Sequence, residues 1–338
     1  MESVLITGAN GEVGHGLIPA LTQKNKGSII ALDIHEVDPS LQPLVHETVV
    51  ADITDTEILK NLMRDHKVSV IFHLAAVLST GGEKDPERAI AVNAGGTEKL
   101  LEAANKVALE EKRVIKFLFP STIAVYGLPD IDTKKKSPSV KEDQFLNPLT
   151  IYGVTKLYCE NLGKYYAENY HLLNSSEQKG IDFRCVRFPG IISALTLPTG
   201  GTSDYAPEMI HSAAQGKGYE SFVRPDTKIS FMVMPDAVKA LLQLSNAPKE
   251  KLKKHIYNVQ AFSAQADEIA QLVNKVFPDS SISYNPDPNR QKIVDSWPEA
   301  TDDSDARNDW GWQPDFDLQK SFNEYLIPEI KNRYNNKG

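Results

Sequence analysis

The stretch LITGANGEVG at residues 5–14 decides the fold, because three glycines three residues apart follow directly behind a short apolar run. The run predicts a buried strand, and residues 13–25 have the apolar spacing of the helix that follows it. Gly8, Gly11 and Gly14 therefore occupy the turn from strand to helix. Bare glycines allow a tight turn and a close approach of ligand to backbone, and the N–H groups of a helix start attract anions. The stretch predicts a site for the pyrophosphate of a dinucleotide.

The rest of the chain repeats the same alternation of strand and helix. Apolar runs rich in β-branched residues, without strict alternation, predict strands buried on both faces at residues 28–33, 47–53, 68–76, 114–122 and 183–193. Helical patterns such as residues 55–66 lie between them. This order predicts an α/β fold with a Rossmann-type doubly wound parallel sheet.

The pattern loosens after about residue 180 and becomes rich in Gly, Pro, Ser and Thr. We predict an NAD-binding domain over residues 1–180, to which parts of 222–260 return, and a smaller C-terminal substrate-binding domain over residues 181–338. Polarity and proline content predict that residues 128–148 form a surface loop.

Composition favours a small-molecule substrate. The 338 residues carry a net charge of −8 without a long basic run, which argues against nucleic-acid and membrane partners. The longest apolar stretch is interrupted by His73 and is too short to span a bilayer, and no leader pattern for export is expected. Cys159 and Cys185, the two cysteines, are expected to be core thiols in a reducing compartment, and no metal site is expected.

The predicted second strand ends on a carboxylate. Asp33 lies about 25 residues after Gly8, where an acidic side chain binds the adenosine ribose hydroxyls of a dinucleotide. No arginine follows immediately to bind a 2′-phosphate. The cofactor predicted from these residues is NAD rather than NADP.

Tyr152 and Lys156 are the candidate catalytic pair. Four residues apart on a helix, they share one face, although a solvent-exposed pair has the same spacing. A neighbouring ammonium is expected to lower the pKa of the Tyr152 phenol toward the working pH, as a base for an alcohol proton requires. Ser121 and Thr122 add hydroxyl groups at the carboxyl end of a predicted strand, where α/β folds bind ligands.

From the glycine turn through Tyr152 and Lys156, the chain resembles the extended short-chain dehydrogenase/reductase family. The resemblance implies that Thr122 completes the catalytic set, and that Asn93 supports the central helix. It also implies that Asp52 and Ile53 bracket the adenine. His73 is expected to be a hydrogen-bonded residue at a strand end. The predicted cofactor contacts are Gly8, Asn10, Gly11, Glu12, Val13, Gly14, Asp33, Ile34, Asp52, Ile53, Leu74, Ala75, Ala76, Asn93, Tyr152, Lys156 and Pro189.

Within that family, the second half is similar to the short-chain-type L-threonine 3-dehydrogenases. The similarity lies in stretches such as HLAAVLS, RFPGIIS, GGTSDYA and DSWPEATDDSDARNDWGW, between residues 73 and 312. It implies oxidation of the β-hydroxyl of L-threonine to 2-amino-3-ketobutyrate. A Gly-Gly-Thr-Ser run offers hydroxyl and N–H donors to a carboxylate. The predicted substrate contacts are Ser79, Thr122, Tyr152, Thr196, Gly201, Thr202 and Ser203, and the chain departs from the group's pattern at Thr199 and Ser203.

Other activities of the same family stay open. A nucleotide-sugar epimerase or dehydratase shares the fold and the Tyr/Lys pair, but Pro189 stands where such epimerases carry Asn. A hydroxy-acid dehydrogenase of the D-erythronate type is a closer alternative. A non-catalytic NAD-sensing protein is a remote one, because such proteins lose the Tyr or the Lys.

The resemblance also implies a homodimer and a compartment. The helices predicted at residues 93–109 and 151–170 carry more apolar residues than one buried face needs, and in this family they form a dimer interface. The apolar residues that we assign to the dimer contact are Leu100, Leu101, Leu157, Leu162, Tyr165 and Tyr166. Bacterial relatives are cytosolic and eukaryotic ones mitochondrial, so the expected location is the cytoplasm, or the mitochondrial matrix for a eukaryotic chain.

Overall fold

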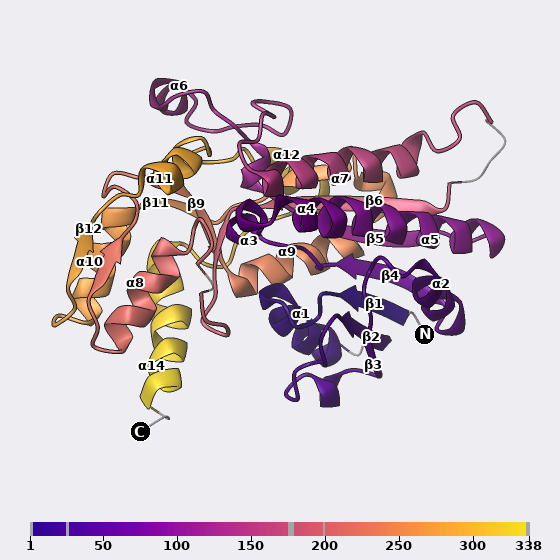
Figure 1. The fold of residues 1–338 in the computed structure, drawn as a ribbon, viewed down its shortest axis with the longest axis horizontal. Coiled ribbons are helices and arrows are strands. Elements are labelled where there is room, and N and C mark those ends of the chain that lie inside the picture. Colours follow the sequence, from indigo (N-terminus) through magenta and orange to yellow (C-terminus); the bar gives the residue numbers. More distant parts are fainter. Residues whose placement is uncertain (1–2, 25–26, 175–178, 199, 336–338) are drawn as a thin grey trace. The chain divides into compact units, whose positions relative to one another are not determined.

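The computed structural model describes residues 3–24, 27–174, 179–198 and 200–335. The chain divides into two compact units, whose elements are labelled in Figure 1. The first unit comprises Met1–Ser121, Ile151–Arg187 and Ala240–Tyr257, and the second comprises Thr122–Thr150, Phe188–Lys239 and Asn258–Gly338.

The first unit is built on a seven-stranded sheet in the order β10-β6-β5-β4-β1-β2-β3. Neighbours from β3 through β2, β1 and β4 to β5 pair in parallel. This is the doubly wound order, in which the chain builds outward from β1 in two directions, so the predicted α/β Rossmann-type fold is confirmed. The strands are β1 (Ser3–Thr7), β2 (Ser28–Asp33), β3 (Glu47–Val50), β4 (Val68–His73), β5 (Ile115–Thr122), β6 (Ile181–Phe188) and β10 (Ile256–Asn258).

Position in the sheet explains the composition of each strand. All five residues of the central strand β1 are buried, and Leu5 pairs with Ile30 on one side and Ile71 on the other. The edge strand β3 instead alternates half-buried and exposed residues. A strand covered on both faces needs a continuous apolar run, whereas an edge strand does not.

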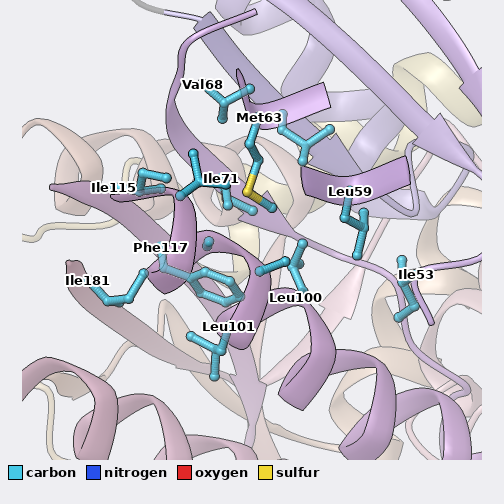
Figure 2. Close-up of a cluster of buried hydrophobic side chains, with 14 of the residues drawn as sticks. Ile53, Leu59, Met63, Val68, Ile71, Leu100, Leu101, Ile115, Phe117 and Ile181 are labelled. Carbon is cyan, nitrogen blue, oxygen red and sulfur yellow. The ribbon is translucent and has the colours of Figure 1, made fainter. Parts of the chain in front are cut away.

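Helices cover the sheet of the first unit. Figure 2 shows Leu100 and Leu101 among the buried side chains that α5 contributes, close to Met63 of α2 and Phe117 of β5. The helices are α1 (Glu12–Gln23), α2 (Thr56–Asp65), α3 (Ser79–Lys84), α4 (Pro86–Ala89), the π-helix η2 (Ile90–Gly96), α5 (Thr97–Glu110) and α7 (Ile151–Glu168), with the short 3-10 helices η1 (Gln42–Leu44) and η4 (Lys249–Lys251).

The second unit has two small sheets. One has the order β11-β9-β7, with β7 (Gly190–Ile192), β9 (Lys228–Val233) and β11 (Phe262–Gln265), and the other pairs β8 (Tyr219–Ser221) with β12 (Ile282–Tyr284). Helix α9 (Met234–Asn246) begins in this unit and ends in the first. The remaining helices are η3 (Ile123–Val125), α6 (Ile131–Lys136), α8 (Tyr205–Ala214), α10 (Ala266–Val276), α11 (Pro288–Asp295), α12 (Ser304–Trp310), α13 (Leu318–Lys320), η5 (Ser321–Leu326) and α14 (Ile327–Asn335).

Two local predictions were wrong. The strand expected at residues 183–193 is two strands, β6 and β7, in different sheets. Pro189 separates them, since proline has no N–H to continue a ladder. The surface loop expected at residues 128–148 contains helix α6, and Lys134 is buried and donates to the Val294 carbonyl at 3.1 Å.

Contacts of residues 122–150 explain why the division into two units differs from the boundary that we predicted at residue 180. The Leu128 N–H donates to the Ser296 carbonyl, and Val140 forms a β-bridge with Thr301. Residues Thr122–Thr150 therefore pack with the C-terminal part of the chain. Residues Ala240–Tyr257 belong to the first unit.

Three further observations concern membranes, thiols and metals. In the part of the chain that the structure describes, no helix has the length and apolarity to cross a bilayer. Cys159 and Cys185 are buried free thiols, as predicted. Among the described residues, no group of three or more His, Cys, Asp or Glu side chains is arranged to hold a metal ion.

Candidate active site

The glycine turn between β1 and α1 packs closely against neighbouring backbone. Gly8 has a φ of +69°, and a Cβ there would lie 2.6 Å from the Cα atom of Ala75 in the segment after β4. A Cβ on Gly14 would lie 2.1 Å from the Ala9 carbonyl oxygen. The residue before α1 is Gly11, which has no side chain of its own to cap the helix. Bare backbone, the N–H groups of a helix start and the positive end of the helix dipole together suit a pyrophosphate.

Asp33 lies beside this turn at the end of β2 and is mostly buried. Its carboxylate accepts hydrogen bonds from the N–H groups of Asn10 at 2.9 Å and His35 at 3.2 Å. A carboxylate has about four acceptor positions, so capacity remains for ribose hydroxyls. The Asn10 side chain bonds the backbone of Glu36 and Asp38, which fixes the loop after β2 to the glycine turn.

Two more segments complete this edge of the sheet. Leu74, Ala75 and Ala76 follow β4 and are half-buried, whereas Ile34 and Asp52 are exposed. Ile53 is buried against Gly96. A Cβ on Gly96 would lie 2.4 Å from Cδ1 of Ile53, so a glycine at this position permits the close packing. β1 and β4 are neighbours at the point where the strand order reverses, which is where doubly wound folds bind nucleotides.

Asn93 supports this edge rather than offering its amide to a ligand. Its Nδ2 donates to the Val77 carbonyl at 2.9 Å and to the Thr155 hydroxyl at 3.2 Å, and its Oδ1 accepts from the Val77 N–H at 2.7 Å. Both amide hydrogens are thereby used. Asn93 fixes the segment after β4 to helix α7, so a direct side-chain donor role toward the cofactor does not fit.

His73 is a hydrogen-bonded strand-end residue, as predicted. Its two ring nitrogens bond the hydroxyls of Thr7 at 2.7 Å and Thr97 at 2.9 Å. Burial, and secondarily the charge of Lys156, lowers the pKa of His73 to about 3. The ring is therefore neutral at physiological pH and connects β1, β4 and α5.

Tyr152 and Lys156 share one face of α7, as their spacing predicted. The Lys156 Nζ lies 5.8 Å from the centre of the Tyr152 ring. It lies 4.4 Å over the Phe119 ring and donates to the Pro120 carbonyl at 2.8 Å, so the ammonium is fixed to the carboxyl end of β5. Lys156 is buried and Tyr152 is half-buried.

The expected lowering of the Tyr152 pKa is not found. Burial raises the pKa of Tyr152 to about 12 and lowers that of Lys156 to about 8. The ammonium is directed to the Pro120 carbonyl rather than to the phenol oxygen, so desolvation dominates both groups. Stabilisation of the phenolate therefore needs more than the presence of Lys156 on the same helix face.

Sequence reasoning missed the residues that hold α7 in place. The Ile151 N–H at its start donates to the Glu83 carboxylate at 2.9 Å. Glu160, one turn beyond Lys156, is fully buried and accepts two hydrogen bonds from the Arg187 guanidinium of β6 at 2.8 and 2.6 Å. The four-residue spacing from Lys156 to Glu160 was the available signal, because it puts a carboxylate on the catalytic face.

Two adjacent hydroxyls end β5. Ser121 is buried, and its Oγ has no hydrogen-bond partner among the described atoms. The Thr122 hydroxyl oxygen accepts from the Ala124 N–H at 3.1 Å, which leaves its hydrogen to be donated. Thr122 belongs to the second unit and Tyr152 to the first, so their cooperation stays a prediction.

The predicted substrate contacts are divided between the units. Ser79 is buried at the start of α3 in the first. Thr196, Gly201, Thr202 and Ser203 belong to the second unit, and of these four residues Thr202 is buried. Pro189, a predicted cofactor contact, belongs to the second unit as well and is buried between β6 and β7. The departure at Thr199 lies outside the described residues.

The chain matches the family described as NAD dependent epimerase/dehydratase over residues 4–259 and belongs to that family. NAD is the cofactor of this protein. A set of groups in the first unit fits NAD: the turn at Gly8 and Gly14, the start of α1 and the Asp33 carboxylate.

Individual relatives narrow the comparison. The chain is 38% identical over 318 residues to a mitochondrial L-threonine 3-dehydrogenase of Bos taurus, covering 94% of this chain and 80% of the relative. A solved L-threonine dehydrogenase from Clostridium difficile is 34% identical, with a TM-score of 0.85 and 98% of both chains covered. A monomeric L-threonine 3-dehydrogenase from a metagenome is 36% identical, with a TM-score of 0.84 and coverage of 98% and 99%.

Proposed function

We propose that this protein oxidises L-threonine at its β-hydroxyl to 2-amino-3-ketobutyrate. The observation that carries the proposal is the Tyr152–Lys156 pair, with the Lys156 ammonium 5.8 Å from the Tyr152 ring centre on α7. The similarity to proteins named L-threonine 3-dehydrogenase supports the choice of substrate, because it extends over nearly the full chain.

In this reaction Tyr152 takes the hydroxyl proton of threonine as general base. Bound NAD supplies the acceptor for the hydride. Burial raises the pKa of Tyr152 to about 12. The charge of Lys156 is therefore required to stabilise the phenolate form of Tyr152, which accepts the proton of threonine. The Thr122 hydroxyl, whose oxygen already accepts from the Ala124 N–H, donates to the substrate oxygen and orients it.

The stretch between β7 and α8 supplies the contacts to the carboxylate of the substrate. Thr196, Thr202 and Ser203 carry hydroxyls that can donate to the carboxylate of a small zwitterion, and Gly201 precedes Thr202 in the same stretch. Ser79, which belongs to the first unit, is a further proposed contact. A site made of hydroxyl and N–H donors favours a compact amino acid over a nucleotide sugar.

A substrate panel tests the proposal. Purified protein with NAD receives L-threonine, L-allo-threonine, L-serine, D-erythronate or UDP-glucose, and NADH absorbance and epimerisation are followed separately. L-Threonine should have the highest kcat/KM. L-Serine should react weakly, because one methyl group is worth about 1–3 kcal/mol in such a pocket. A higher kcat/KM for D-erythronate than for L-threonine, or epimerisation of UDP-glucose, would show that L-threonine is not the preferred substrate.

We further propose a two-fold homodimer through α7. Leu100 and Leu101 have no exposed surface and Tyr166 is buried in the core of the first unit, so the dimer residues expected there need correction. The apolar stripe that α7 does expose consists of Val154, Tyr158 and Tyr165, with Leu157 and Leu162 half-buried beside it.

Charged side chains introduced into this stripe should disrupt the dimer contact with little effect on the core, because the stripe residues are exposed. Val154→Glu combined with Tyr158→Glu should convert a dimer to a monomer in multi-angle light scattering, while Lys99→Glu on the charged face of α5 should not. One relative is named as a monomer, which makes the oligomeric state worth measuring. A wild-type protein that is monomeric at micromolar concentration would contradict the proposed dimer.

The proposed location is the cytoplasm, or the mitochondrial matrix in a eukaryotic cell. The two buried free thiols fit a reducing compartment, and the bovine relative is named as mitochondrial. Fractionation of the source cells with antibody detection tests the location, and recovery in a secreted fraction would contradict it.

A further inference from the structure

Arginines from the C-terminal part of the second unit hold both ends of the segment that carries the predicted threonine contacts. We define this substrate segment as residues 193–198 and 200–204. Arg333 of α14 donates to the carbonyls of Leu195 at 3.0 Å and Ala194 at 3.3 Å. Arg290 of α11 donates to the carbonyls of Gly201 at 2.9 Å and Gly200 at 3.4 Å.

The side chain of Arg290 is itself positioned before it reaches the segment. Its backbone N–H, near the start of α11, donates to the capping carboxylate of Asp287 at 2.9 Å. Its guanidinium lies over the Phe222 ring, 3.1 Å from the ring centre. Phe222 packs edge-on against Tyr205, the first residue of α8. A planar guanidinium can stack on a ring and donate in its plane at the same time, which an ammonium cannot.

The contacts at Gly201 fix the peptide groups on both of its sides. The Gly201 N–H donates to the Asp204 carboxylate at 2.6 Å, while its carbonyl accepts from Arg290. Because the peptide group is planar and trans, the Thr202 N–H points away from the guanidinium. A hydrogen bond to the carbonyl also polarises the same peptide and strengthens its N–H as a donor.

Glycine is required for this arrangement. Gly200 has a φ of +84°, and a Cβ on Gly201 would lie 2.8 Å from Oδ1 of Asp204. The charge of Arg290 has acidic neighbours in Asp204 and Glu208, and Glu208 accepts from the Tyr219 hydroxyl at 2.6 Å. Nη2 of the guanidinium thus bonds backbone carbonyls while the guanidinium plane lies over the Phe222 ring.

We propose that Arg290 is a positioning residue for the substrate: it fixes the Gly201–Thr202 peptide so that Thr202 meets the carboxylate of threonine. This role rests on the proposed function. Arg290 acts through the substrate segment, so its loss should weaken substrate binding more than it slows the chemical step.

The experiment compares Arg290→Gln and Arg290→Lys with a matched control, Arg224→Gln. The Arg224 guanidinium donates to Asp295 of the same helix α11 at 2.9 and 3.0 Å and to Asp226 at 3.0 Å. Hydrogen exchange of residues 200–204 is measured without substrate, the KM and kcat for threonine by NADH absorbance, and NAD affinity by calorimetry.

Arg290→Gln should raise exchange at residues 200–204 and the threonine KM about tenfold each, with kcat changed less than about threefold, because a hydrogen bond from a charged donor is lost. Arg290→Lys should fall between wild type and Arg290→Gln, since a lysine keeps the charge without the fork. NAD affinity should stay unchanged, and Arg224→Gln should alter neither exchange nor KM.

Unchanged exchange in Arg290→Gln would overturn the anchoring role, and raised exchange with an unchanged threonine KM would overturn the link to substrate. The exchange measurement needs no turnover. If the wild type fails to reduce NAD with threonine, the proposed function falls, and the exchange result still decides whether Arg290 orders the segment.

Discussion

The glycine turn of the first unit and the substrate segment of the second are both glycine-containing, but they are held in different ways. At the turn, Gly8, Gly11 and Gly14 meet backbone atoms of nearby residues and of the segment after β4. At the substrate segment, Gly200 and Gly201 accept hydrogen bonds from the side chain of Arg290, which lies 90 and 89 residues further along the chain. The need for glycine in the first arrangement comes from backbone contacts, whereas the second also depends on a distant side chain. Changes to the first should therefore alter folding and NAD binding, and changes to the second should alter substrate binding.

The largest effect should come from the proposed base on α7. Tyr152→Phe removes the proposed proton acceptor and should lower kcat by about 10²–10⁴, equivalent to about 3–5 kcal/mol of activation free energy. NAD affinity and thermal unfolding should stay close to wild type, because the half-buried residue 152 loses its hydroxyl group but keeps its ring. Turnover within tenfold of wild type would remove Tyr152 from the role of base.

The next effect tests the backbone-determined turn. Gly8→Ala should lower the free energy of unfolding by about 2–4 kcal/mol, since the residue has a left-handed φ and its Cβ would meet the backbone of Ala75. Gly95→Ala is the control, because the nearest atom to a Cβ there is 3.9 Å away. Urea unfolding measures both. Equal stability of the two variants would show that the turn adapts more easily than its contacts indicate.

A pH effect should follow from His73. Its pKa is about 3 when folded against an ordinary value of 6.5, so the unfolded chain binds the proton more readily. The stability that this group contributes is complete above pH 6.5 and falls by about 1.4 kcal/mol per unit below it, or about 2 kcal/mol by pH 5.

The slope of unfolding free energy against pH measures this contribution. His73→Gln should reduce the slope between pH 6 and 4.5 by about one proton, whatever its stability at neutral pH. His66, which is partly exposed beside Glu47, is the comparison residue, and His66→Gln should leave most of the slope in place. A slope that is the same in His73→Gln and in the wild type would refute the assignment.

The smallest effect should come from the substrate segment. Thr202→Ala should raise the threonine KM about three- to tenfold without changing NAD affinity, because one hydroxyl contact is worth about 1 kcal/mol. Val223→Ala, a buried apolar truncation in the same unit, is a control for general loosening. Threonine kinetics identical to wild type in Thr202→Ala would mean that this hydroxyl does not meet the substrate.

The sequence by itself determined the features that depend on local chain geometry. The alternation of apolar runs and helices predicted the doubly wound sheet, because a strand covered on both faces can be recognised from its own residues. The spacing of Tyr152 and Lys156 predicted their common face, because helix periodicity is local. The glycines of residues 8–14 predicted the turn, since the left-handed φ of Gly8 and the close contact of Gly14 with Ala9 are local.

Only the tertiary structure decided what depends on distant partners. Lys134 is buried in a stretch that reads as a polar loop, because Val294 accepts its hydrogen bond. The pKa of Tyr152 is raised rather than lowered, because burial outweighs a lysine whose ammonium bonds the Pro120 carbonyl. Arg290 reaches Gly201 across 89 positions of sequence. Desolvation and long-range contacts are properties of the packed chain, and no local pattern encodes them.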